Sequence, residues 1–149
     1  MIDTDGTLIE NHHATTVAVG TAAAMIVGPS GSGKSALALE LIGMGAKLIS
    51  DDISRVALID GAPVVLAPDH LHGVIEARGV GLIQVPWGAE ARLHLVVDMS
   101  ENQLERFPRS QLVTTVVGCA VERVLRVDAP YFASALYHLL NNGRFSDTN

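Results

Sequence analysis

The stretch "GPSGSGKS", from Gly28 to Ser35, decides the fold of this chain. It satisfies the pattern G-x-x-x-x-G-K-[ST] in full. An apolar run, "AAAMIVG", leads into it, and an almost wholly apolar segment from about Lys34 to Met44 follows it. This order of strand, glycine-rich loop and helix predicts backbone N–H groups that bind phosphates at the positive end of a helix. The alternative is a glycine-rich turn that only caps a helix.

The residues of this motif have separate predicted roles. Lys34 is predicted to neutralise the β- and γ-phosphates of a bound nucleotide, and the Ser35 hydroxyl is predicted to ligate Mg²⁺. The expected nucleotide-binding residues are Gly28, Pro29, Ser30, Gly31, Ser32, Gly33, Lys34 and Ser35.

The flanking segments predict an α/β domain with a strand-rich mixed sheet around the buried helix that follows the loop. This helix is expected to pack against the sheet because Leu37, Leu41 and Met44 fall on one face. The dipeptide Asp60-Gly61 lies between two β-rich runs and predicts a hairpin. A short helix is expected from Tyr131 to Leu140. The other expected strands are 15–20, 22–28, 46–50, 79–85, 91–99 and one or two within 114–127. The expected boundaries are a flexible tail at 1–11, the domain at 12–141 and a second flexible tail at 142–149.

Composition restricts the class of protein. The 149 residues suit one domain, and a hydrophobic content of 48% with only 17% charged residues suggests surface covered by another copy, hence a homo-oligomer. A net charge of -6 argues against a nucleic-acid partner. The longest uncharged stretch, Ala14 to Gly33, is interrupted by Thr, Gly and Pro, so no membrane span is expected. The single cysteine, Cys119, excludes an internal disulfide and fits a cytoplasmic protein.

Two adjacent carboxylates, Asp51 and Asp52, end the run "AKLISDD" shortly after the motif. Alternation along a strand would point them to opposite sides, so we expect them to have different tasks. One is predicted to face the reacting phosphate as a general base, and the other to support a metal or a neighbouring group. The alternative is a turn or helix N-cap at Ser50 to Ser54, where Ser and Asp are common.

Weaker candidates lie on either side. His12 and His13 open the strand pair that leads into the loop, where an imidazole could reach a bound phosphate. Glu76 in "EARG" is either a functional acid or half of a surface ion pair with Arg78. The stretch "DTDGTL", Asp3 to Leu8, has the look of the aspartate motif of haloacid-dehalogenase-type phosphatases. Because only two residues precede it, we interpret it as an exposed turn.

These motifs together resemble the catalytic domain of the bacterial HPr kinase/phosphorylase family. The resemblance runs from about His13 to Val97 through the histidine, "GPSGSGKS", "LISDD" and "EARGVGLIQV", the last close to the family's E-I-R-G-x-G-I-I-x-V. It implies a P-loop kinase fold related to phosphoenolpyruvate carboxykinase. It also implies a cytoplasmic enzyme that uses ATP and Mg²⁺ to phosphorylate a serine on an HPr-like phosphocarrier of the phosphotransferase system. Many members also reverse this reaction with inorganic phosphate.

The resemblance implies roles for individual residues. Asp51 matches the base that deprotonates the serine, Lys34 the phosphate-binding lysine, and His13 the active-site histidine. Ser35 and Glu76 match the Mg²⁺ ligands. Asp52 is expected to support Asp51 or the metal.

The chain also departs from the family pattern. Pro29 stands where an aspartate is common, Ala77 replaces an isoleucine, and the arginine loop linked to the reverse reaction has no clear counterpart among Arg106, Arg109, Arg123 and Arg126. Two other functions stay open at this point. They are a P-loop kinase for a small molecule and a nucleotide-binding sensor without catalysis.

Overall fold

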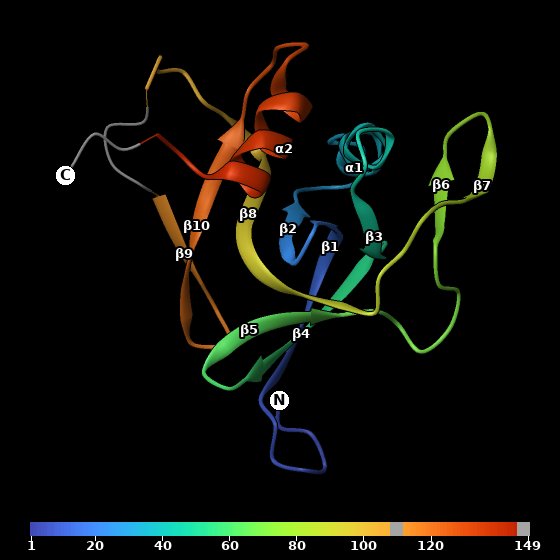
Figure 1. Cartoon of the computed structure of the whole chain (residues 1–149), viewed down its shortest axis with the longest axis vertical. Coiled ribbons are helices and arrows are strands. Elements are labelled where there is room, and N and C mark those ends of the chain that lie inside the picture. The colour runs from blue at the N-terminus through green and yellow to red at the C-terminus, as the bar shows by residue number, and fades with distance from the viewer. Residues whose placement is uncertain (108–111, 146–149) are drawn as a thin grey trace.

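A computed structural model describes residues 1–107 and 112–145 of the chain, which form a strand-rich mixed sheet with two helices (Figure 1). The helices are α1 (Lys34–Gly43) and α2 (Phe132–Asn142). The strands are β1 (Ile9–Val19), β2 (Ala22–Val27), β3 (Lys47–Ser50), β4 (Ile53–Ile59), β5 (Ala62–Leu66), β6 (Val74–Ala77), β7 (Gly81–Gln84), β8 (Glu90–Asn102), β9 (Leu112–Val116) and β10 (Cys119–Arg126). The predicted strand-rich mixed sheet is confirmed.

The main sheet closes on itself. β1 pairs antiparallel with β2 and β4, β5 pairs antiparallel with β4 and β8, and β8 pairs in parallel with β2. These pairings join β2, β1, β4, β5 and β8 in a ring, so each of the five strands has a hydrogen-bonded neighbour on both sides. β10 extends the sheet beside β8, and β9 follows it as an antiparallel edge.

β2 and β3 end at the same edge of this sheet, and β8 runs past the end of β2 to Asn102. β2 and β3 both run antiparallel to β1, and β8 runs parallel to β2, so these three strands point the same way. Val27 at the end of β2 is directly opposite Asp98 of β8. Loops after the carboxyl ends of parallel strands are the usual place for a ligand in α/β sheets. This edge, which carries residues 28–33 and 51–52, is therefore where we look for the site.

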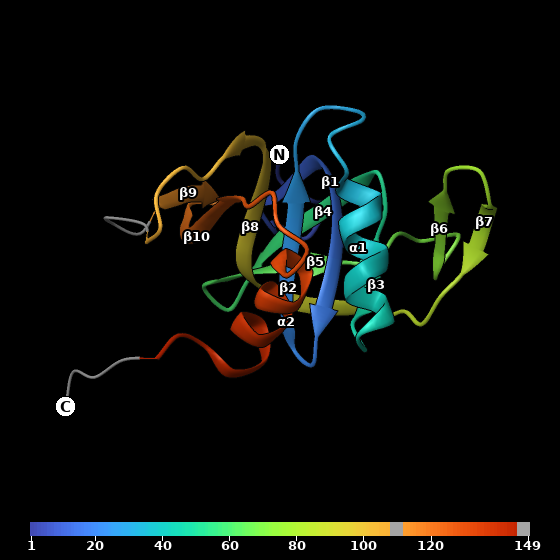
Figure 2. The same ribbon diagram turned by 90° about the horizontal axis from the view of Figure 1, so that it is seen from above.

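Both helices cover one face of the sheet (Figure 2). α1 buries Leu37 and Leu41, and α2 buries Leu136, in a single core cluster with residues of β1, β2 and β8. A second cluster of buried residues fills the inside of the strand ring. The predicted burial of the first helix is confirmed, but Met44 is exposed and does not share its buried face. The helix ends at Gly43, so Met44 no longer follows the helical period.

Two hairpins follow local sequence chemistry. Asp60 and Gly61 have φ of 52° and 75° between β4 and β5, as a tight two-residue turn requires, which confirms the predicted hairpin. Val117 and Gly118, with φ of 43° and 78°, divide the apolar run near the C-terminus into β9 and β10.

The N-terminal residues form an exposed turn. The backbone N–H of Asp3 donates to the carbonyl of Thr7 at 2.7 Å, and a bridge joins Ile2 to Leu8. β1 begins at Ile9, three residues before the expected start of the domain, because Ile9 to His13 pair with β4.

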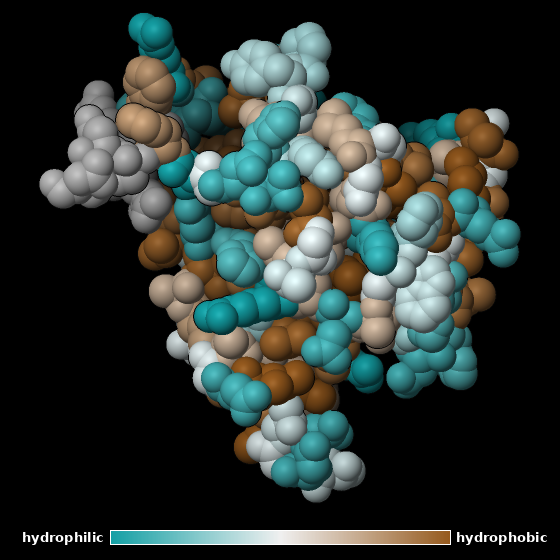
Figure 3. All heavy atoms as spheres, viewed as in Figure 1, coloured by the Kyte–Doolittle hydropathy of each residue, from teal (hydrophilic) through white to brown (hydrophobic). Residues whose placement is uncertain are grey.

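The β6–β7 hairpin forms a separate two-stranded sheet that stands away from the main one (Figures 1 and 2). Ile75 anchors it, since this side chain is fully buried in the same core cluster as Leu37 and Leu41. Val80 and Leu82 at its tip are largely exposed, and hydrophobic residues gather at this end of the molecule in Figure 3. The hairpin is held at its base and offers apolar surface at its tip.

No helix among the residues described here has the length and apolar character needed to cross a membrane.

Candidate functional site

The glycine-rich loop is held against strand β8. Gly28 has φ of 144°, and a Cβ at this position would lie 2.8 Å from Ser32 Oγ and 3.1 Å from Met99 Cβ. Both distances are tighter than side chains normally tolerate, so only glycine allows the backbone to approach so closely. Met99 also lies 3.7 Å from the position of a Cβ on Gly33. The loop therefore packs against Met99.

Side-chain donors of this loop lack an anionic partner in the part of the chain that the structure describes. The Ser32 hydroxyl is buried and has no hydrogen-bond partner within the described residues. Lys34 Nζ donates to the carbonyls of Gly28 at 2.7 Å and Pro29 at 3.1 Å, and no carboxylate among residues 1–107 and 112–145 pairs with it. The first turn of α1 has no acidic residue to offset the partial positive charge of the helix. These groups fit an anion such as the phosphates of a nucleotide.

Asp51 and Asp52 form the tight connection between β3 and β4. The Thr15 hydroxyl, which is 1% exposed, donates to Asp51 Oδ1 at 2.9 Å. Asp52 has φ of 71°, and its carbonyl accepts from the N–H of Ala14 at 3.1 Å. The expected alternation of these two side chains is wrong, because β3 ends at Ser50 and the pair lies outside the strand. Both residues border one surface hollow. The connection is a turn in geometry and keeps one oxygen of Asp51 oriented by Thr15.

Buried hydroxyls support this turn from inside the strand ring. Ser54 Oγ donates to the carbonyl of Ala14 at 2.9 Å and lies 2.7 Å from both Thr16 Oγ and Ser50 Oγ. Thr16, Ser50 and Ser54 are almost completely buried. The network ties β1, β3 and β4 together directly beneath the two aspartates.

We expect Ser54→Ala to lower the free energy of unfolding by about 1–3 kcal/mol, because Thr16 and Ser50 would lose a buried partner. Urea unfolding measures the change. Thr21→Ala, in the exposed turn between β1 and β2, is the matched control and should stay within about 0.5 kcal/mol of the parent. Equal stability of the Ser54 variant and this control would show that the network contributes nothing.

His13 lies on β1 and Glu76 on β6. His13 is exposed on β1, two residues before Thr15, so their side chains share one face of the strand. Glu76 is exposed on β6, since its neighbour Ile75 points into the core. Among the described residues no hydrogen bond or ion pair joins Glu76 to Ser35 or to Arg78, so the alternative of a surface ion pair is not formed. His12 points to the other face, 3.0 Å from Glu10.

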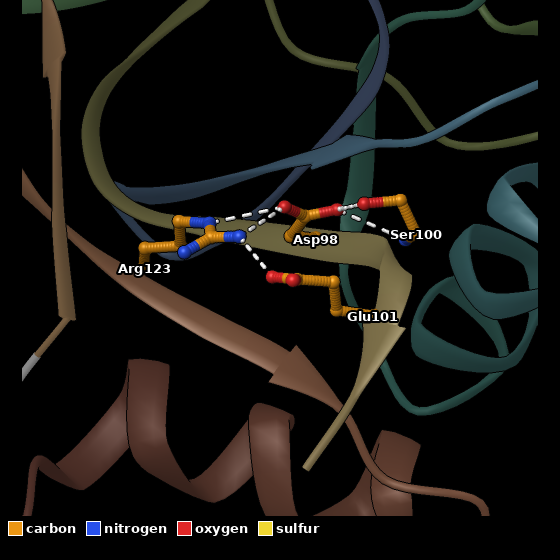
Figure 4. Close-up of polar contacts among 4 residues, drawn as sticks. All are labelled: Asp98, Ser100, Glu101 and Arg123. Carbon is orange, nitrogen blue, oxygen red and sulfur yellow. Dashed lines mark hydrogen bonds and ion pairs between the residues drawn. The ribbon is translucent and has the colours of Figure 1, made fainter.

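A second polar cluster surrounds Asp98 of β8 (Figure 4). Arg123 donates through two nitrogens to Asp98 Oδ2 at 3.0 and 2.8 Å, and also pairs with Glu101 at 2.6 Å. The N–H and the hydroxyl of Ser100 donate to Asp98 Oδ1. Burial opposes ionisation of Asp98, but the hydrogen bonds from Ser100 and Arg123 outweigh it and place the pKa of this carboxyl below its usual range. These contacts form a structural ion pair between Asp98 and Arg123, supported by Ser100 and Glu101.

The lowered pKa of Asp98 gives a pH-dependent contribution to stability. A carboxyl with a lower pKa in the folded state stabilises the protein above its ordinary pKa of about 4, and this stabilisation is lost as pH falls through the folded value. We expect Asp98→Asn to cost about 2 kcal/mol at pH 7 and less at pH 3, where the parent has lost part of the same contribution. Thermal unfolding from pH 7 to pH 3 measures this. An equal cost at both pH values would contradict it.

Three residues near the candidate site were missed from the sequence. Thr15 contacts Asp51, while Asn11 and Arg55 border the same hollow as the aspartate pair. A two-residue period from His13 gives Thr15 and Asn11 the same strand face, which is the signal that could have identified them. The side chain of Arg55 reaches this face only through the pairing of β4 with β1.

Comparisons with known proteins identify one family. A family model described as HPr Serine kinase C-terminal domain matches residues 7–128. The HPr kinase/phosphorylase of Variovorax paradoxus (strain S110) is 37% identical over 114 residues, which cover 68% of this chain and 36% of that protein. The same-named protein of Polaromonas naphthalenivorans (strain CJ2) is 35% identical over the same shares. The chain therefore spans little more than a third of these curated relatives.

A solved structure also has this fold. The Hpr(Ser) kinase/phosphatase from Coxiella burnetii superimposes with a TM-score of 0.73 at 23% sequence identity, and the match covers 89% of each chain. This likeness concerns the arrangement of strands and helices.

Proposed function

Since this chain belongs to the HPr serine kinase C-terminal domain family, we propose that it is an ATP- and Mg²⁺-dependent kinase for a serine of an HPr-like phosphocarrier. The proposal includes a P-loop kinase fold related to phosphoenolpyruvate carboxykinase and a cytoplasmic location. The observation that carries it is the position of Asp51, oriented by buried Thr15 at the sheet edge that also carries the glycine-rich loop. This arrangement provides a candidate base beside a candidate phosphate site.

The loop residues would bind the phosphates of ATP. Ser32 offers an unpartnered hydroxyl, and Lys34 can exchange two backbone carbonyls for phosphate oxygens that carry full charge. Ser35 and Glu76 would hold Mg²⁺, because hydroxyl and carboxylate oxygens are the ligands this ion prefers and it needs few from the protein. When bound, Mg²⁺ would neutralise the charge of the transferred group.

Asp51 would act as the base. The Thr15 hydroxyl engages its Oδ1 oxygen, which leaves Oδ2 to accept the proton of the incoming serine. Phosphoryl transfer depends mostly on positioning and on charge stabilisation, so orienting this carboxylate matters as much as its basicity. His13 would contact the phosphates from the same face of β1, and Asp52 would support the turn or the metal. In the reverse direction Asp51 would return the proton to the serine oxygen.

We also propose that the protein assembles with further copies of itself. Val80 and Leu82 at the tip of the β6–β7 hairpin and Leu71 before it are each more than three quarters exposed. Exposed aliphatic side chains on a projecting hairpin are typical of a surface that a partner covers.

Transfer of labelled phosphate separates this function from its two alternatives. With Mg²⁺, labelled ATP and a purified HPr-like carrier, the proposed kinase gives labelled phosphoserine. A small-molecule kinase would give a labelled metabolite from a cell extract and an unlabelled carrier. A nucleotide sensor would bind ATP and label neither. Addition of inorganic phosphate to the phosphorylated carrier then measures the reverse reaction.

A further inference from the structure

A hollow of about 350 Å³ adjoins the aspartate pair on the outer face of the strand ring. Three strands provide its floor. Asn11 of β1 pairs with Arg55 of β4, and Arg55 pairs with Leu66 of β5, so the three side chains lie side by side across the sheet. The remaining lining residues are Asp51, Asp52, Ile53, Pro68 and Asp69. The hollow therefore begins at the candidate base and extends away from the glycine-rich loop.

Arg55 has unused hydrogen-bonding capacity in this hollow. Its Nε is buried and has no partner within the described residues. Its ion pair with Asp69 is long, at 3.7 Å, and the Asp69 side chain is 76% exposed. An exposed pair of this kind contributes little. A buried donor without a partner is rare in a folded protein. The Arg55 side chain as a whole is 39% exposed, so a molecule in the hollow can supply an acceptor to the accessible part of the guanidinium.

The hollow is lined by three carboxylates, those of Asp51, Asp52 and Asp69, and by one guanidinium, and these charges are distributed unevenly along it. Asp51 and Asp52 lie at the end nearest the loop, and Asp51 is partly engaged by Thr15. Arg55 lies farther along β4, with exposed Ile53 on the same strand face between it and the aspartates. A chain segment that brings a hydroxyl to Asp51 would pass over Ile53 and meet the guanidinium. The planar fork of arginine favours a carboxylate at that point.

We infer that this hollow receives the segment of the acceptor protein that flanks its reactive serine, and that Arg55 pairs with a carboxylate of that segment in place of Asp69. The inference rests on the proposed function and names a feature of its protein substrate. Ile53 and Leu66 would contact apolar side chains of the same segment. Arg55 is a residue for recognition of the acceptor and takes no part in the transfer step.

The test compares binding with transfer. Calorimetry measures the Kd of a purified HPr-like carrier for the parent, Arg55→Gln, Arg55→Lys and Arg92→Gln. Arg92 is an exposed arginine of β8 that does not border the hollow, so it is the matched control. We expect Arg55→Gln to weaken carrier binding about 10- to 100-fold, Arg55→Lys to weaken it less, and Arg92→Gln to have no effect. The KM for ATP and kcat at saturating carrier should be unchanged in all variants.

A panel of carrier variants, each lacking one Asp or Glu, identifies the partner group. One of them should bind the parent as weakly as Arg55→Gln binds the normal carrier, with no further loss when both changes are combined. A panel in which no Asp or Glu variant weakens binding, or equal binding by Arg55→Gln and Arg92→Gln, would overturn the inference.

The two proposals fail in different ways. Carrier binding that depends on Arg55 without any transfer would contradict the kinase function and leave the docking inference standing. Normal transfer with an unchanged carrier KM in Arg55→Gln would contradict the docking inference alone. A parent that neither binds nor phosphorylates the carrier would overturn both. Thermal unfolding and ATP binding of each Arg55 variant establish that it is folded.

Discussion

Asp51→Asn is expected to bind ATP as tightly as the parent, or more tightly, and to transfer phosphate about 10²- to 10⁴-fold more slowly. The amide keeps the shape of the side chain and can still accept the Thr15 hydrogen bond seen at Asp51 Oδ1. It cannot take the serine proton. It also removes a negative charge from beside the phosphate site, which explains why ATP binding should not weaken. ATP titration and single-turnover transfer to the carrier measure the two effects separately.

Asp52→Asn is the matched control, since it removes the same charge from the next residue of the same turn. We expect weaker metal or structural support from this change and a smaller loss of the transfer rate. Near-normal transfer by Asp51→Asn together with an inactive Asp52→Asn would mean that the two roles are reversed. Both directions of the reaction pass through one transition state, so any reverse activity should fall in parallel in the Asp51 variant.

Lys34→Ala is expected to abolish measurable transfer and to weaken ATP binding while the protein stays folded. Within the described residues the lysine ammonium donates to two loop carbonyls, those of Gly28 and Pro29, so its loss should leave the folded core intact. In the nucleotide complex the same group would offset phosphate charge, which a neutral side chain cannot do.

Lys47→Ala serves as the control for this change, because Lys47 is an exposed lysine at the start of β3. Circular dichroism, thermal unfolding and ATP titration of both variants check the prediction. Parental ATP affinity and turnover in Lys34→Ala would refute the assignment of the loop.

Local sequence patterns were sufficient for much of the fold. The turn at Asp60 and Gly61 follows from residue types that tolerate positive φ, and the helix after Gly33 follows from its apolar period. Met44 was misjudged because two glycines border it, and the helix ends before it. The closure of the strand ring was not predicted, since it depends on the parallel pairing of β2 with β8, two segments far apart in the sequence.

Only part of the candidate site could be predicted from local sequence patterns. The loop and the aspartate pair are contiguous motifs, and their types and order pointed to phosphate chemistry. Thr15 and Asp51 are 36 residues apart, and their contact requires β3 to lie beside β1. Arg55 gains its significance from the absence of a partner for Nε in the described structure, which no sequence pattern encodes. Contacts across a sheet depend on register, and register was visible only in the folded chain.

Phosphate transfer to the carrier in a single turnover, followed by mass spectrometry of the intact carrier and its peptides, tests the proposed kinase function most directly. With excess enzyme, Mg²⁺ and ATP, we expect one added phosphate on one serine of the HPr-like carrier, and none with Lys34→Ala or without Mg²⁺. A carrier that stays unmodified while the protein binds ATP with Mg²⁺, or phosphate found on a residue other than serine, would contradict that function.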